Sequence, residues 1–108
     1  MYYVRVQIIR YVDDSQPGWV ECAFQDAWGR EWIFIDKLPI FTEAYLDEQS
    51  NYPQPGFIAV EIVGTWRDDN GRELISIDTS RPWGIEATDG ETQFNIIAEQ
   101  VVQQLDVI

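Results

Sequence analysis

Glu31 and Glu73 are the residues with the best claim to catalytic chemistry in this chain. They hold equivalent places in two segments, DAWGREWIFID (26–36) and DDNGRELISID (68–78), which share seven of eleven residues in register. Two carboxylates can divide acid and base roles when their surroundings separate their pKa values, as glycoside hydrolysis requires. The alternative, which we favour, is a pair of exposed glutamates whose spacing follows from repetition of the segment alone.

A calcium site is the second chemical hypothesis, since the clustered oxygens of DDSQ (13–16) and DDNGRE (68–73) suit a hard cation. Arg72 occupies an alternate ligand position, however, and no bidentate glutamate follows at loop position twelve. Turn formation therefore explains these acids better, and we expect no metal.

Several other classes of chemistry lack their residues. The chain contains no histidine and a single cysteine, Cys22, which excludes Ser/His/Asp and Cys/His machinery, an internal disulfide and ordinary zinc sites. Neither GxGxxG nor GxxxxGK[ST] is present, so no nucleotide site is indicated. We expect a buried Cys22 thiol, no cofactor and no enzymatic activity.

Five tryptophans offer a different kind of site, because exposed aromatic side chains often dominate affinity at protein interfaces. Trp28 is predicted at a hairpin tip, and Trp83 lies between Pro82 and Gly84 in a stiff loop. The alternative is that both rings fold back over the sheet. The candidate binding residues are Trp28, Trp83, Trp32, Phe34, Asp26, Asp68 and Asp69.

The charge limits the partners. Seven basic and nineteen acidic residues give a formal net charge of −12, so nucleic acid and anionic membranes would be repelled. A basic protein is the partner class that this charge favours, although solubility alone also explains an acidic surface. The first residues, MYYVRVQIIR, alternate and lack the apolar core of a signal peptide, so we expect a cytoplasmic protein.

Hydrophobic alternation predicts the elements that must position these residues. Six strands are expected, at 2–12, 19–25, 30–36, 57–66, 72–78 and 92–97, with short helices near 42–50 and 98–105. The predicted fold is a single all-β domain over 1–108, a six-stranded barrel or rolled antiparallel sheet, with a β-sandwich as the alternative.

Two related hairpins, 16–36 and 54–78, are predicted to build this sheet, because QPGW and QPGF precede the two similar segments. The shared D-x-x-G predicts a type I turn closed by a left-handed glycine, while Asn70-Gly71 could instead form a two-residue turn. Matching the copies predicts that Ile33, Ile35, Ile75 and Ile77 face the core. Trp32 and Phe34 would then face outward beneath the segment 37–53.

These observations favour a non-catalytic module that binds a basic protein, such as an inhibitor or immunity-type protein. Two alternatives stay open. One is a hydrolase that uses Glu31 and Glu73, and the other is a homodimeric assembly domain that pairs through exposed strand edges or the Trp32 and Phe34 face.

Overall fold

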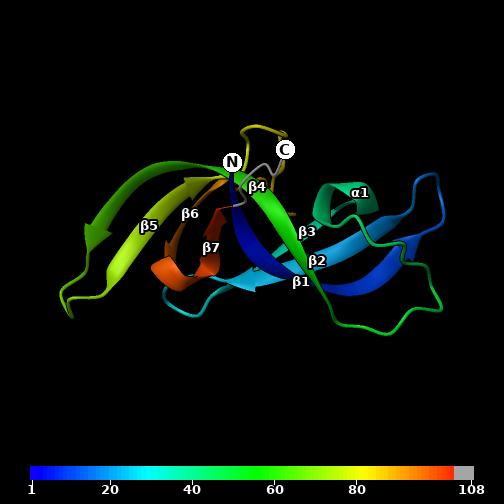
Figure 1. The fold of residues 1–108 in the computed structure, drawn as a ribbon, viewed down its shortest axis with the longest axis horizontal. Coiled ribbons are helices and arrows are strands. Elements are labelled where there is room, and N and C mark those ends of the chain that lie inside the picture. The colour runs from blue at the N-terminus through cyan, green and yellow to red at the C-terminus, as the bar shows by residue number, and fades with distance from the viewer. Residues whose placement is uncertain (104–108) are drawn as a thin grey trace.

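The computed structural model describes residues 1–103 and shows one curled antiparallel sheet (Figure 1). Its strands follow the order β3-β2-β1-β4-β5-β6, and β7 pairs with β1. The bounds are β1 Tyr2–Asp13, β2 Trp19–Gln25, β3 Glu31–Lys37, β4 Gln54–Arg67, β5 Glu73–Asp78, β6 Gln93–Ile97 and β7 Val101–Gln103. The prediction of an all-β rolled sheet is confirmed. Because neighbouring strands form one hydrogen-bonded series, the β-sandwich alternative is wrong.

The two longest strands produce the curl. β4 pairs with β1 through residues 54–60 and with β5 through residues 61–67, and a bulge at Val63 lies within the part that pairs with β5. β1 pairs with β4 from residue 2 to residue 8 and with β2 from residue 7 to residue 13, and its register shifts between Ile8 and Arg10. Bulges bend a strand and increase its twist, so each long strand can turn a corner of the sheet.

The C-terminal prediction of a helix over 98–105 is wrong within the described residues, which exclude 104 and 105. Ala98–Gln100 forms a single 3₁₀ turn, η1, and the chain then re-enters the sheet as β7. Tyr2 and Val4 of β1 pair there with Gln103 and Val101. Val101 and Val102 are therefore partly buried by strand pairing.

The helix predicted at 42–50 is also wrong, because the only helical turn in this connection, α1, spans Leu38–Phe41. Beyond it, side chains bind nearby backbone amides: Thr42 Oγ1 accepts from Ala44 N at 3.0 Å and Asp47 Oδ1 accepts from Gln49 N at 2.9 Å. Such local bonds satisfy the backbone without a helix.

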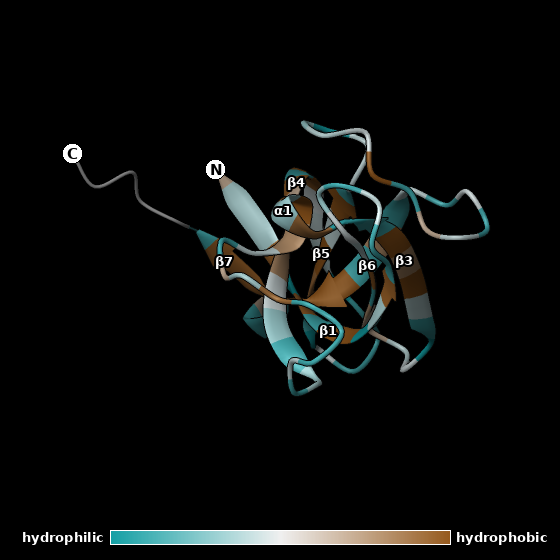
Figure 2. Ribbon diagram, turned by 90° about the vertical axis from the view of Figure 1, so that its right-hand side faces the viewer, coloured by the Kyte–Doolittle hydropathy of each residue, from teal (hydrophilic) through white to brown (hydrophobic). Residues whose placement is uncertain are grey.

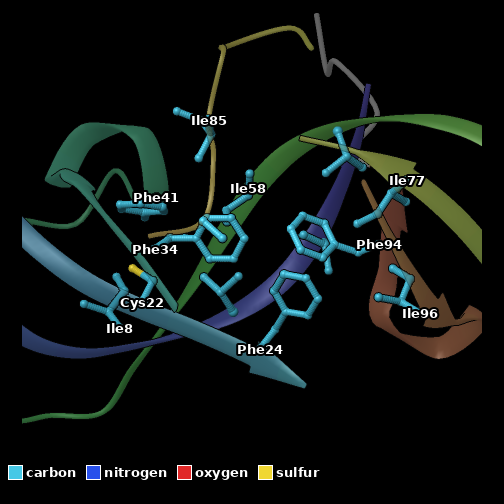
Figure 3. Close-up of a cluster of buried hydrophobic side chains, with 14 of the residues drawn as sticks. Ile8, Cys22, Phe24, Phe34, Phe41, Ile58, Ile77, Ile85, Phe94 and Ile96 are labelled. Atoms are coloured by element: carbon cyan, nitrogen blue, oxygen red, sulfur yellow. The ribbon is translucent and has the colours of Figure 1, made fainter. Parts of the chain in front are cut away.

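The core lies inside the curl, where the strands surround a common interior in Figure 2. Figure 3 shows three phenylalanines meeting there: Phe24 stacks on Phe34 with centroids 5.6 Å apart, and Phe94 meets Phe24 edge-on at 5.3 Å. Leu38, Phe41 and Leu46 bring the middle connection into the same cluster. That connection is thus part of the core rather than a free loop.

The predicted inner face is correct for β5 but wrong for β3. Cys22 pairs with Phe34, and directly paired residues share a face, so Phe34 is fully buried while Ile35 is 38% exposed. In the second hairpin, Ile75 and Ile77 do face the core. The extra residue at the β4 bulge shifts the alternation of the second hairpin by one residue relative to the first. Equivalent residues of the two hairpins therefore lie on opposite faces of the sheet.

The turn prediction is confirmed in both copies. Asp26 Oδ1 accepts from the amides of Trp28 and Arg30 at 2.9 and 3.0 Å, and Asp68 Oδ1 accepts in the same way from residues 70 and 72. Gly29 and Gly71 have φ values of 84° and 78°. No described non-glycine residue has positive φ, which removes the two-residue turn at 70–71.

The Gln-Pro-Gly segments, in contrast, differ in structure. Residues 16–18 form the turn before β2, with Gly18 at a φ of 98°, whereas residues 54–56 are the first residues of β4 itself. The structural feature that the two hairpins share is therefore the Asp-x-x-Gly turn. Duplication of the whole hairpin, 16–36 and 54–78, stays a prediction.

Candidate aromatic hollow

An open hollow of about 550 Å³ lies on the surface of the described chain. Tyr3 of β1, Phe57 of β4 and Trp83 of the β5–β6 loop line it, together with residues 39–44 of α1 and the turn that follows. In Figure 1, α1, the start of β1 and the β5–β6 loop surround this part of β4. Its walls therefore come from segments far apart in the sequence. We call this feature the aromatic hollow.

Strand pairing places two of the rings. Val4 and Ile58 pair with each other and are fully buried, so their neighbours Tyr3 and Phe57 point to the outer face. The two rings meet edge to face, with centroids 6.3 Å apart and planes at 78°. This is a favourable aromatic geometry that leaves Phe57 partly exposed at the hollow.

Trp83 is held by a well-anchored loop. The buried Thr79 donates from its hydroxyl to the carbonyl of Ile85 at 2.6 Å, and its amide donates to the carbonyl of Thr92 at 2.8 Å. Ile85 is itself buried in the core, as Figure 3 shows. Both sides of the loop around Trp83 are thereby fixed, and the indole is left 61% exposed.

Charge at the aromatic hollow is negative. Glu43 is the one charged residue among the side chains that line it in the described chain, and Tyr45 stands exposed just beyond. Arg81 of the same loop is paired with Glu61, with Nη1 and Oε2 3.4 Å apart. Arg5, which pairs in register with Phe57, is the nearest cation along the outer face of β1.

Trp28 belongs to a different aromatic group. Its ring lies 6.3 Å from that of Trp66, whose indole Nε1 donates to Ser76 Oγ and Asn95 Oδ1 at 3.2 and 3.3 Å. Trp28 is 60% exposed, and neither tryptophan lines the aromatic hollow. Trp28 and Trp83, the two candidate binding tryptophans in loops, are thus both exposed, but they belong to separate surfaces. Trp66 is itself 41% exposed.

Two other predicted binding residues, Trp32 and Phe34, are corrected by the structure. Phe34 is buried, and Trp32 packs edge-on to Phe94 at 4.9 Å while Arg30 covers its ring at 3.8 Å. Both residues face the interior because they pair directly with Phe24 and Cys22 of β2, which are buried. A homodimer built on this face therefore loses its structural basis.

Of the three acidic residues predicted to bind a partner, Asp26 and Asp68 stabilise their turns, whereas Asp69 is exposed. Asp26 Oδ2 accepts from the indole of Trp32 at 2.9 Å, and Asp68 Oδ2 accepts from Arg72 Nε at 2.8 Å. The Arg72 side chain, and next its backbone amide, hold the pKa of Asp68 below the ordinary aspartate value. Asp69 is exposed at the turn. Asp26 and Asp68 thus act chiefly within their own hairpins.

Glu31 and Glu73 are not brought together. In β3, Glu31 shares the outer face with Ile33 and Ile35, whereas in β5, Glu73 shares alternation with the buried Ile75 and Ile77. Both are exposed, and Glu31 borders a shallow hollow that does not include Glu73. Over residues 1–103, no group of three or more acidic or cysteine side chains is placed to hold a metal ion.

Cys22 lies fully buried in the core, as expected (Figure 3). Burial, and next the charge of Glu21, raises the pKa of its thiol far above the ordinary value. A thiol in this state is a poor nucleophile, because the thiolate is the reactive form.

None of the helices in the described part of the chain is long and apolar enough to span a bilayer. Comparison of the sequence with protein-family models and with curated proteins, and of the fold with solved structures, found no match.

Proposed function

We propose that this protein is a non-catalytic interaction domain that binds a basic protein through the aromatic hollow. The observation that carries the proposal is the display of Trp83 on an anchored loop beside Tyr3 and Phe57, in a chain of net charge −12. Rigid aromatic side chains around a concave surface supply contact area at low entropic cost.

Electrostatics favour a cationic partner. Glu43 is at the aromatic hollow, and the surplus of acids over the whole chain attracts a basic surface at long range. The same surplus repels phosphate backbones and anionic membranes, so neither belongs to the proposal. An inhibitor or immunity-type protein that neutralises a cationic enzyme in the cytoplasm fits this description.

The test is capture of partners by the immobilised chain from source lysate at low ionic strength, followed by release with increasing salt. We expect a basic protein to be retained and to elute as the salt concentration rises, because charge attraction is screened. Trp83→Ala should abolish retention and Trp28→Ala should preserve it, since the two indoles are equally exposed but only Trp83 lines the hollow. Retention of no basic protein, or retention that salt does not weaken, would contradict the proposal.

A further inference from the structure

We infer that the aromatic hollow receives an arginine side chain carried on an extended basic segment of the partner. This inference rests on the proposed function and adds the chemistry of recognition. The aromatic residues Tyr3, Phe57 and Trp83 line the hollow, and Glu43 supplies the single charge among its lining residues in the described chain.

Guanidinium suits this combination better than the other charged groups of proteins. It is planar and weakly hydrated, so it can stack on an aromatic face while its edge donates hydrogen bonds to a carboxylate. A lysine ammonium is more strongly hydrated and loses more when it leaves water. A carboxylate or phosphate would meet Glu43 with no compensating cation among the lining residues.

The same chain already shows this arrangement internally. The guanidinium carbon of Arg30 lies 3.8 Å from the centroid of the Trp32 ring, and Arg30 Nη2 lies 3.7 Å from Asp89 Oδ2. A guanidinium thus rests on an indole with a carboxylate nearby. The aromatic hollow presents the aromatic and acidic parts of this arrangement, with no arginine of its own among the residues that line it.

The hollow is large enough to hold more than one side chain. A volume of about 550 Å³ is in the range of pockets that enclose whole small ligands. Pro39 and Ile40 extend the apolar lining beside the rings. An extended segment can therefore place its arginine against Trp83 and lay its neighbouring residues along α1.

The probe is a short peptide, acetyl-Ser-Gly-Arg-Gly-Ser-amide, compared with the same peptide containing citrulline, which keeps the shape of arginine and lacks its charge. Binding is followed by NMR, through the indole N–H signals and the backbone amides. We expect the arginine peptide to shift the Trp83 indole and the amides of residues 42–44, and to bind at least about 5-fold more tightly than the citrulline peptide. The lysine peptide should be intermediate.

Matched variants identify the groups responsible. Trp83→Ala should remove the arginine preference, and Glu43→Gln should weaken binding about 2- to 5-fold. Trp28→Ala, at an indole with 60% exposure against 61% for Trp83, should leave binding unchanged. Arg5→Gln should strengthen binding, because it removes the cation that pairs in register with Phe57. Equal unfolding midpoints show that the variants are folded, and the shifts of the unmutated chain map the site independently.

Equal affinity for the arginine and citrulline peptides, or shifts confined to Trp28 and Trp66, would overturn the inference. The peptide experiment and the capture experiment can fail independently of each other. A captured basic protein whose footprint lies on Trp28 and Trp66 would keep an interaction function and remove arginine recognition by the hollow. Arginine-dependent shifts at Trp83 without any basic partner would support the chemistry of the hollow and remove the proposed function.

Discussion

Arg72 of the second hairpin turn is hydrogen bonded to Ala27 of the first, with Nη1 2.9 Å from the backbone carbonyl oxygen. The same guanidinium donates from Nε to Asp68 within its own turn. Ala27 and Arg72 are 45 positions apart in the sequence. Their hydrogen bond thus connects the two hairpin turns, next to the Trp28 and Trp66 rings.

Arg72→Met should therefore lower the free energy of unfolding by about 1 kcal/mol, because it removes a hydrogen bond to a partly buried carbonyl. Arg30→Met is the matched control in the first hairpin. It should cost less, about 0.5 kcal/mol, since Arg30 is 63% exposed, its ion pair with Asp89 is long and its contact with the Trp32 ring is the main interaction lost. Urea denaturation measures both values, and equal losses would show that the tie between the turns contributes nothing.

Thr79→Val should destabilise the protein by about 1 to 3 kcal/mol and weaken binding at the aromatic hollow. The substitution keeps the shape of the side chain but leaves the carbonyl of Ile85 without the hydroxyl donor that anchors the Trp83 loop. Thr79→Ser retains the hydroxyl and should preserve loop order. Hydrogen exchange at residues 80–86 compares the two variants, and equal protection would contradict this role of Thr79.

Gly56→Ala should cost about 1 to 3 kcal/mol, because the added Cβ would lie 3.0 Å from the Ile8 side chain and 3.1 Å from the Phe41 carbonyl. It would press α1 away from β4 and so distort one wall of the aromatic hollow. Gly64→Ala, in the same strand, meets nothing within 4 Å and should be neutral or slightly stabilising. Thermal unfolding distinguishes them, and a neutral Gly56→Ala would show that α1 can shift freely.

Asp68 should make folding sensitive to acid. Its pKa is lowered in the folded state, first by the Arg72 side chain, so its stabilising effect is present above the ordinary aspartate pKa near 4. That effect is lost as the pH falls through the lowered pKa. Asp68→Asn should flatten the decline of stability below about pH 4, whereas Asp69→Asn, one residue away and exposed, should not. Parallel declines for Asp68→Asn and the unmutated chain would contradict this assignment.

Local chemistry made much of the fold predictable from the sequence. Alternation located β2, β4 and β5 and the buried face of β5, because one side of each strand must leave water. The Asp-x-x-Gly turns were also predictable, since every bond that closes them joins residues within five positions of each other.

Only the tertiary structure decided which way β3 faces and where the aromatic hollow lies. A one-residue bulge at Val63 inverts the relation between turn and inner face, so Ile35 is exposed in the first hairpin whereas the matching Ile77 is buried in the second. The pairing of β1 with β4 places Tyr3 beside Phe57. Thr79 anchors the β5–β6 loop, which brings Trp83 to the same hollow from a distant part of the sequence. Such long-range pairing depends on how the whole sheet curls, which no short window of sequence records.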